Sequence, residues 1–445
     1  MEVHPPQLHA EFAWIGDAVR RDVLIDIEGD RFETVAPDTA CPRGVPRLRG
    51  LSVPGFANAH SHAFHRALRG RTQAATGNFW TWREQMYGVA AGLDPDSYLA
   101  LARATYAEMV LAGFTCVGEF HYLHHDRDGT RYADPNAMSA ALAEAARTAG
   151  IRLTLLDTCY LRGGIGAPLD GVQHRFDDGS ADDWASRVSS FRPPGNGIRV
   201  GAAVHSVRAV PREEIGEVAR WAAASGAQLH VHVSEQQAEN DACVGAYGLS
   251  PVALLDAEGA LGPRSVAVHA VRVDAADIAT LAASGTAVCA CPTTERDLAD
   301  GVLPAGALAA ADVPMCLGTD SHAVVDPLAE ARALEMDERL ASGVRGTFPA
   351  AVLLSAASPA GHRALGWTDA GRIAPGALAD VVTIGLESVR LAGAADPLAA
   401  ALFAGTAADV HSVVVGGRLV VDDGQHLAMD DVARSLATSI AAVTT

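Results

Sequence analysis

The chain has 445 residues and a formal net charge of −19, and 49% of its residues are hydrophobic. A chain of this length exceeds an ordinary single domain and fits one large domain with a smaller one. The negative charge disfavours nucleic acid and anionic membrane surfaces as partners, because their phosphate groups would repel it.

The sequence contains no lysine, so the 34 residues counted as Lys+Arg are all arginine. This absence excludes Schiff-base lysines and P-loop lysines. It also excludes a carbamylated lysine that bridges two metal ions. Any metal centre in this chain is therefore expected to be mononuclear.

The seven cysteines are scattered along the chain, without a Cys-x-x-Cys pair. An odd number of scattered cysteines predicts reduced, mostly buried thiols in a reducing compartment, so we expect a cytoplasmic protein. No basic segment followed by an apolar run opens the chain, so we expect no signal peptide. Because no uninterrupted apolar segment of about 18 residues occurs, we expect no membrane span.

The two ends of the chain have the pattern of short β-strands separated by turns. Each end carries apolar runs flanked by glycine or acidic residues, which predicts β-hairpins. Because chain termini commonly lie close together, we predict that residues 1–50 and 371–445 form one composite β domain, a small β-sandwich. The strand-like runs are residues 22–27, 31–35, 380–384, 412–415 and 418–421, and a terminal helix is expected over residues 430–442.

Between these ends, apolar strand-like runs alternate with helical stretches rich in Ala, Leu and Arg. Buried parallel strands form continuous apolar runs, and the stretches between them are long enough for crossover helices. Eight such units predict an α/β fold, a (β/α)8 TIM barrel, over residues 51–370. The eight runs are residues 51–58, 115–120, 152–158, 199–204, 228–233, 265–271, 286–290 and 315–318.

Polar and ionisable side chains follow these runs at a recurring position. Active sites of such barrels lie at the carboxyl ends of the strands, and barrel packing does not explain such residues there. His60 and His62 are alternate residues of an extended segment, so they can face one point and suit a divalent cation such as Zn²⁺. The other strand-end residues are Glu119, His121, Tyr122, His205, Arg208, His232, Glu235, His269 and Asp320.

Each of these residues also has a simpler structural interpretation. A single strand-end histidine is more often a hydrogen-bonded residue than a metal ligand, and Asp320 alone could be a turn or helix-cap residue. His230 could be a core histidine, and His121, His124 and His125 could be solvated loop residues that stay unassigned. The combination at one edge of the barrel, rather than any single residue, favours a functional site.

The arrangement of these motifs resembles the amidohydrolase superfamily, in its mononuclear deaminase branch. The resemblance covers essentially the whole chain and depends on HxH after the first strand, HxxE after the fifth, a histidine after the sixth and an aspartate after the eighth. It implies one Zn²⁺ per chain, and Fe²⁺ or Mn²⁺ could occupy the same ligands. The implied metal ligands are His60, His62, His232 and Asp320, and the implied catalytic residues are Glu235, His269 and Asp320.

A narrower resemblance lies in the segments that follow the strands. Residues 54–64 and 79–87, with the run Phe-Trp-Thr-Trp-Arg-Glu, resemble the N-formimino-L-glutamate deiminase family of histidine degradation. This resemblance implies hydrolysis of a small dicarboxylate, N-formimino-L-glutamate, to N-formyl-L-glutamate and ammonia. We also expect a homodimer, the commonest oligomer. The implied substrate-binding residues are His65, Arg83, Tyr122, His205 and Arg208.

Arginine suits a dicarboxylate substrate, because a guanidinium group binds a carboxylate through a planar fork. The simpler interpretation is that Arg83 and Arg208 form surface ion pairs. The family usually has glutamine where this chain has His65. This difference leaves open a shorter substrate such as N-formimino-aspartate, or another acid that carries an amidine group.

Three other functions have features that distinguish them. A deaminase of a purine or a triazine shares the metal site but needs a flat apolar pocket without carboxylate forks. A catalytically inactive assembly protein predicts a broken set of metal ligands, and here the set is intact. A cytidine-deaminase zinc site is disfavoured, because no Pro-Cys-x-x-Cys follows His9-Ala10-Glu11.

Overall fold

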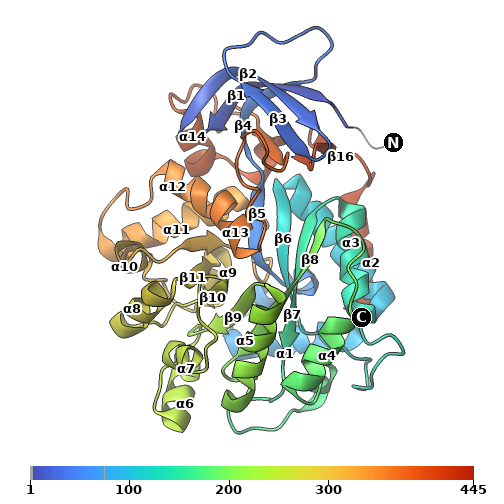
Figure 1. Cartoon of the computed structure of the whole chain (residues 1–445), viewed down its shortest axis with the longest axis vertical. Helices are drawn as coiled ribbons and strands as arrows, with labels where there is room; N and C mark the ends of the chain where they lie inside the picture. The colour runs from blue at the N-terminus through green and yellow to red at the C-terminus, as the bar shows by residue number, and fades with distance from the viewer. Residues whose placement is uncertain (1–3, 75, 445) are drawn as a thin grey trace.

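The computed structural model describes residues 4–74 and 76–444. The strands in this part of the chain form two sheets of eight. In Figure 1 one sheet, built from both chain ends, lies above a body of strands surrounded by helices. The predicted fold class, a (β/α)8 barrel with a separate small β domain, is confirmed.

The barrel sheet consists of parallel strands that pair in chain order. Its first and last strands meet, because the backbone N–H groups of Thr319 and Asp320 donate to the carbonyl oxygen of His60 at 3.1 and 3.0 Å. Gly318 permits this approach, since a Cβ atom there would lie 2.7 Å from the Cβ atom of His60. The barrel strands are β5 (Phe56–Ser61), β6 (Phe114–His121), β7 (Arg152–Cys159), β8 (Ile198–Ser206), β9 (Leu229–Val233), β10 (Ser265–His269), β11 (Ala287–Ala290) and β12 (Met315–Leu317).

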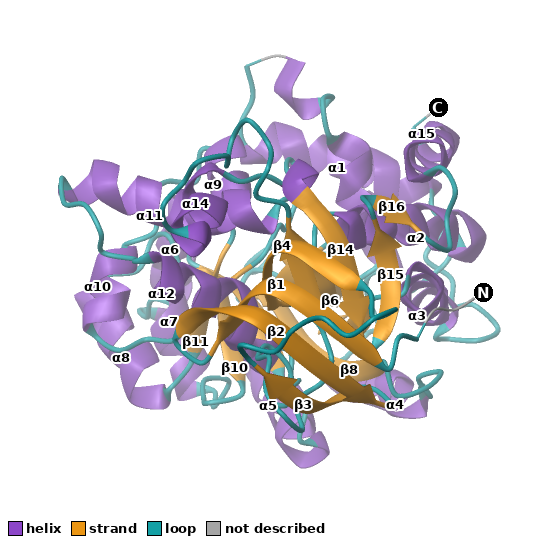
Figure 2. Ribbon diagram, turned by 90° about the horizontal axis from the view of Figure 1, so that it is seen from above, coloured by secondary structure: helices purple, strands orange, loops and turns teal. Residues whose placement is uncertain are grey.

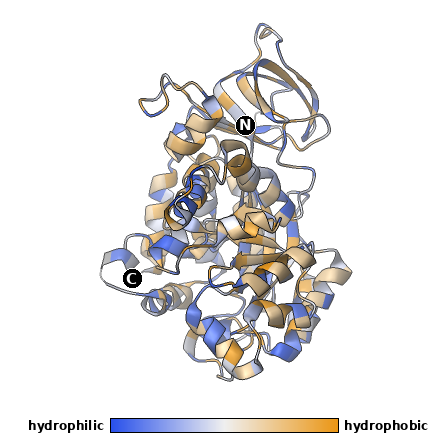
Figure 3. Cartoon of the chain, turned by 90° about the vertical axis from the view of Figure 1, so that its left-hand side faces the viewer, coloured by the Kyte–Doolittle hydropathy of each residue, from blue (hydrophilic) through white to orange (hydrophobic). Residues whose placement is uncertain are grey.

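Helices follow the barrel strands and surround them (Figure 1). Side chains cap helix starts: Asn78 accepts the N–H groups of Trp80 and Thr81, and Asp94 accepts that of Ser97. Such caps bind N–H groups that have no partner inside the helix. Several outer helices carry hydrophilic segments, blue in Figure 3. The helices are α1 (Phe79–Gly92), α2 (Pro95–Leu111), α3 (Ala137–Ala149), α4 (Ala181–Ser190), α5 (Arg212–Ser225), α6 (Gln237–Tyr247), α7 (Pro251–Ala257), α8 (Ala275–Ser284), α9 (Pro292–Asp297), α10 (Ala305–Ala310), α11 (Pro327–Ser342), α12 (Ala350–Ser355), α13 (Gly361–Ala364), α14 (Pro397–Ala404) and α15 (Val432–Val443).

The small-domain sheet combines strands from both chain ends in the order β16-β15-β14-β13-β4-β1-β2-β3 (Figure 2). The strands expected to form a sandwich belong to one continuous mixed sheet, with a core that includes Leu8, Val23, Phe32 and Val414. The N-terminal hairpin is present as β2 and β3, but β1 was not predicted. The strands are β1 (Gln7–Ile15), β2 (Ala18–Glu28), β3 (Arg31–Ala36), β4 (Arg47–Pro54), β13 (Val381–Ile384), β14 (Val410–Val415), β15 (Arg418–Asp422) and β16 (Gln425–His426).

The prediction of one strand over residues 51–58 is wrong. The chain divides at Gly55 into β4, which belongs to the small-domain sheet, and β5, which opens the barrel. The pattern of apolar residues could not reveal this division, because the chain is buried on both sides of Gly55. The predicted domain limit at residue 50 falls within β4, and the domain limits stay a prediction.

The terminal helix α15 packs against the barrel helix α2 (Figure 2). Six of the seven cysteines are buried, and all seven are free thiols.

Among the described helices, none combines the length and apolar character needed to cross a membrane.

A buried ion pair joins β7 of the barrel to the chain just before β13. The guanidinium of Arg152 donates to both carboxylate oxygens of Asp380, at 3.0 and 3.2 Å. Asp380 also accepts the backbone N–H of Gly416 at 2.7 Å. The pair therefore holds the small-domain sheet against the barrel.

The substitution Asp380→Ala is expected to lower the free energy of unfolding by about 3–5 kcal/mol, because it leaves the Arg152 charge buried without its partner. Urea unfolding followed by circular dichroism measures this change. In the control Arg434→Ala, loss of an exposed ion pair with Asp431 should change the free energy by less than about 0.5 kcal/mol. Equal effects of the two substitutions would contradict the stabilising role of the buried pair.

Candidate metal centre and active site

The four predicted metal ligands lie together at the carboxyl ends of β5, β9 and β12. The Nε2 atoms of His60 and His232 are 3.0 Å apart. The Oδ1 atom of Asp320 lies 3.4 Å from the Nε2 atoms of both His60 and His62. All four side chains are buried. Residues from distant parts of the sequence thus direct four ligand atoms at one small volume.

Hydrogen bonds behind two of the imidazoles fix the direction of their lone pairs. The Nδ1 atom of His62 lies 2.9 Å from the carbonyl oxygen of Phe120, and that of His232 lies 3.0 Å from that of His205. A carbonyl oxygen only accepts, so Nδ1 carries the proton and Nε2 keeps its lone pair. Lone pairs and a carboxylate that face one another repel unless a cation lies between them. The donor set therefore fits a cation such as Zn²⁺.

The protonation states of these groups agree with metal binding. Burial lowers the pKa of His62 to about 3 and that of His232 well below its ordinary value, so both imidazoles are neutral. Burial alone would raise the pKa of Asp320, but the neighbouring imidazoles of His60, His269 and His62 hold it well below its ordinary value. Neutral imidazoles and an ionised carboxylate are the forms that bind metal ions.

The predicted acid–base residues Glu235 and His269 lie beside this cluster. The Nε2 atom of His269 is 3.8 Å from Oε1 of Glu235 and 3.8 Å from Oδ2 of Asp320. Burial raises the pKa of Glu235 to about 7. Burial alone would lower the pKa of His269, but Glu235, Glu295 and Asp320 raise it to about 10. Neighbouring residues whose pKa values are strongly shifted are typical of sites that transfer protons.

Strained backbone occurs at the same strand ends. Ser234, His269 and Asp320 have φ values of +51°, +71° and +42°, in the left-handed region that residues other than glycine rarely adopt. Each such conformation costs on the order of 1–3 kcal/mol and persists where the surrounding structure enforces it, often at active sites.

All the predicted site residues except His60 line one pocket. The Arg208 side chain is only 15% exposed, and its guanidinium lies 3.4 Å from the buried carboxylate of Glu239 and 3.9 Å from that of Glu235, so the interpretation of Arg208 as a surface ion-pair residue is wrong. Arg83, on α1, is half-buried and lies 4.6 Å over the ring of Trp80. The pocket thus presents two guanidinium groups near the ligand cluster.

His65, which stands where the family usually has glutamine, also lines this pocket. The Nε2 atom of His65 lies 3.1 Å from the hydroxyl oxygen of Tyr122. The His205 ring lies 5.3 Å from the Tyr122 ring. These three side chains therefore form one continuous part of the pocket lining.

The prediction that His121, His124 and His125 could be solvated loop residues is wrong, because all three are buried. They line no part of this pocket. His230 is also buried, and its Nε2 atom lies 2.9 Å from the carbonyl oxygen of Ala364. This contact matches the interpretation of His230 as a core histidine.

Sequence reasoning missed several residues of the site. Trp82 and Tyr87 lie in the run that resembles the deiminase family, but they were not singled out. Glu295 follows the seventh barrel strand, where no residue was assigned, and its position was a usable signal. The missed lining residues are Phe79, Trp82, Met86, Tyr87, Tyr160, Phe176 and Leu298.

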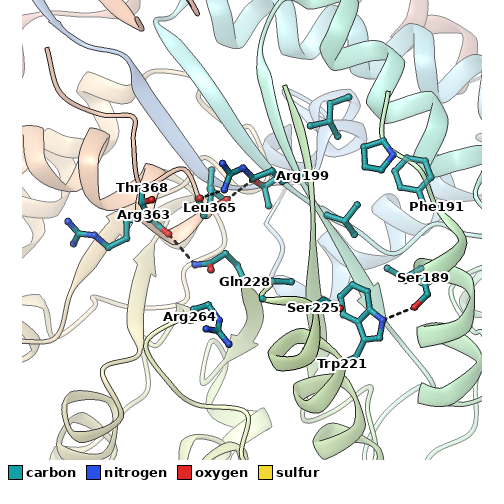
Figure 4. A pocket seen from close by; sticks show the side chains of 18 of the residues that line it. Ser189, Phe191, Arg199, Trp221, Ser225, Gln228, Arg264, Arg363, Leu365 and Thr368 are labelled. Atoms are coloured by element: carbon teal, nitrogen blue, oxygen red, sulfur yellow. Dashed lines mark hydrogen bonds between the residues drawn. The ribbon is translucent and has the colours of Figure 1, made fainter. Parts of the chain in front are cut away.

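A larger and more open pocket lies at the amino ends of β8, β9 and β10 (Figure 4). Its lining includes Arg199, Gln228, Arg264 and Trp221, and none of the predicted site residues. Barrel enzymes place their active sites at the opposite ends of the strands. The smaller pocket is therefore the candidate active site.

Comparison with known proteins agrees with this geometry. Residues 51–420 match the amidohydrolase family. A formimidoylglutamate deiminase of Pseudomonas aeruginosa is 37% identical over 444 residues, which cover 96% of this chain and 97% of that protein. An 8-oxoguanine deaminase of the same organism is 30% identical over 394 residues, which cover 87% of this chain and 86% of that protein.

Comparison with solved structures also shows similarity to amidohydrolases. A crystal structure of an amidohydrolase from Brucella melitensis has a TM-score of 0.90 and 32% identity, and covers 99% of this chain and 100% of that one. An adenosine deaminase of Xanthomonas campestris with bound zinc has the same fold, with a TM-score of 0.84 and 24% identity over 98% of this chain and 97% of that one. The chain therefore belongs to the amidohydrolase family, as its motifs indicated. It is a hydrolase that acts on carbon–nitrogen bonds.

The substitution His232→Ala is expected to abolish tight metal binding, because it removes one of four converging ligands. The matched control is His230→Gln, two residues earlier on the same strand, which should keep about one metal ion per chain. Elemental analysis of dialysed protein measures the metal content. Equal metal content in the two variants would contradict the assignment of His232 as a ligand.

Proposed function

We propose that this enzyme hydrolyses N-formimino-L-glutamate to N-formyl-L-glutamate and ammonia. The observation that carries the proposal is that Arg83 and Arg208 line the same pocket as the acid–base pair and the metal ligands. A formimino glutamate has two carboxylates for guanidinium groups to bind, and an amidine carbon for water to attack. The identity to a formimidoylglutamate deiminase supports this substrate.

His60, His62, His232 and Asp320 would hold one Zn²⁺ per chain. The zinc ion, when bound, lowers the pKa of a water molecule and so supplies a nucleophile at neutral pH. The chemistry of the donor set supports zinc, and so does the zinc of the Xanthomonas adenosine deaminase structure.

The protein's own groups then move the protons. The Asp320 carboxylate accepts a proton from the attacking water. His269 orients that water through Nε2 and stabilises the charge that develops at the attacked carbon. Glu235 protonates the imino nitrogen, then takes the remaining proton of the added hydroxyl group and gives it to the departing nitrogen, which leaves as ammonia. The proton held by Asp320 then restores protonated Glu235. The Glu235 pKa of about 7 lets it hold and release a proton near neutral pH.

The arginine side chains place the substrate. Arg208 and Arg83 would each bind one carboxylate through a planar fork, with Tyr122, His205 and His65 completing the wall beside the reacting group. In a chain with a net charge of −19, these local positive charges offset an unfavourable overall field for an anionic substrate.

We also propose that the enzyme works as a homodimer in the cytoplasm. Six buried thiols and the absence of disulfides among the described residues support a reducing compartment. A twofold homodimer is the commonest arrangement of oligomeric enzymes.

Ammonia release from a panel of compounds tests the proposed substrate. N-formimino-L-glutamate is expected to have a kcat/KM at least about tenfold above N-formimino-L-aspartate, because one methylene changes the separation of the two carboxylates. Simple amidines and 8-oxoguanine should react more slowly still, since they lack carboxylates. A higher kcat/KM for 8-oxoguanine, or for an amidine without carboxylates, would contradict the proposal.

The substitution Arg208→Ala should lower kcat/KM by about 10²–10³-fold, because it removes a buried charge-assisted contact with a carboxylate. The matched control is Arg212→Ala, which removes a partly exposed arginine paired with Glu258 and should change kcat/KM by less than about twofold. Steady-state kinetics on the two variants measure the difference. An unchanged value for Arg208→Ala would contradict its role in binding the substrate.

A further inference from the structure

The His269 imidazole has carboxylates on both of its nitrogen sides. On the Nε2 side lie Glu235 and Asp320, each 3.8 Å away. On the Nδ1 side lies Oε1 of Glu295, at 3.5 Å. We propose that Glu295 is a positioning residue, which keeps a proton on Nδ1 of His269 and turns Nε2 toward the reacting centre. This inference rests on the function proposed above and assigns a residue that neither the motifs nor the relatives pointed to.

Glu295 is itself held in place. It lies in α9, the short helix after β11, and its side chain is buried. The oxygen that faces His269 also accepts the backbone N–H of Cys291 at 2.9 Å. The carboxylate therefore cannot turn away from His269 without losing this hydrogen bond, and its position is set by the backbone.

The His269 ring stacks on the ring of His232 at 5.7 Å, a contact that does not decide which of its nitrogens carries a proton. Its backbone and that of Ala270 are both left-handed, with φ values of +71° and +52°. In the described part of the chain, its buried Nδ1 atom has no full hydrogen bond, and Glu295 is the carboxylate that approaches it. Contacts of catalytic groups are often long in free enzymes and tighten when substrate binds.

The position of the proton decides what His269 can do. A neutral imidazole carries its proton on one nitrogen and accepts through the other. With Glu295 at Nδ1, the ring keeps its Nδ1 proton in both the charged and the neutral form, so the proton that the ring gains or loses lies on Nε2, which faces the reacting centre. A carboxylate at Nδ1 also stabilises the positive charge that forms when the ring gains a second proton. Loss of such a partner typically costs about 10–100-fold in activity.

Kinetics of Glu295 variants test the proposal. Glu295→Ala is expected to lower kcat by about 10–100-fold and to change KM by less than about threefold, with the metal content unchanged. Glu295→Gln keeps an oxygen that can accept from both Cys291 and His269, so its kcat should recover to within about tenfold of the wild type. A loss of metal that accounts for the whole loss of kcat, or a kcat of Glu295→Ala within threefold of the wild type, would overturn the proposal.

Glu330→Gln is the matched control. Glu330 is a buried carboxylate on α11 that accepts the backbone N–H of Thr293 at 3.0 Å, so it supports the same short helix without touching His269. Its substitution should leave kcat near the wild-type value. An equal loss of kcat in Glu330→Gln would mean that the position of the helix, and not the contact with His269, determines kcat.

Glu295→Asp is the second variant if Glu295→Ala does not fold. It withdraws the carboxylate by one methylene and should lower kcat by at least about fivefold. An unchanged kcat in Glu295→Asp would overturn the proposal.

A second measurement does not depend on the substrate. Histidine ¹⁵N NMR of zinc-loaded protein reports which ring nitrogen carries the proton, and the signal of His269 is assigned by its absence in His269→Gln. The spectra are recorded at a pH at which the ring has lost its second proton. We then expect the remaining proton on Nδ1 in the wild type and in Glu295→Gln, and a mixture of the two neutral tautomers in Glu295→Ala. An unchanged spectrum in Glu295→Ala would overturn the inference even if the proposed substrate is correct. If the substrate is wrong, the wild type releases no ammonia from it while the spectra still differ.

Discussion

The repulsion between ligand atoms at the mouth of the barrel is the constraint on which the rest of the site depends. The Nε2 lone pair of His62 faces the Asp320 carboxylate at 3.4 Å, and the Nε2 atoms of His60 and His232 lie 3.0 Å apart beside them. Carbonyl groups at the ends of β6 and β8 hold two of the imidazoles in this arrangement. A bound cation would change this repulsion into attraction, so metal binding would stabilise the closed barrel.

The chemistry follows from what surrounds this cluster. Burial keeps Glu235 able to carry a proton at neutral pH, while nearby carboxylates favour a charged His269. Helix α1 brings Arg83, and the loop after β8 brings Arg208, to the same pocket. The barrel thus supplies a fixed site for breaking a carbon–nitrogen bond, and the segments after its strands place two guanidinium groups in the same pocket.

The repeated position of ionisable residues after apolar runs made the barrel and most of the site predictable from the sequence. The division of one apolar run at Gly55 was not predictable, because a buried strand of either sheet has the same pattern. The burial of His124 and His125 depends on carbonyl groups of Thr158 and Asp177, distant in the sequence. The position of Glu295 after the seventh barrel strand was visible in the sequence, but its contact with His269 depends on the folded barrel.

Anomalous diffraction at the zinc absorption edge, from crystals of the purified enzyme, tests the central claim most directly. We predict one strong peak, about 2.0–2.3 Å from the Nε2 atoms of His60, His62 and His232 and from a carboxylate oxygen of Asp320. A peak at another buried group, such as His121, His124 and Asp157, with none at the barrel mouth, would contradict the account.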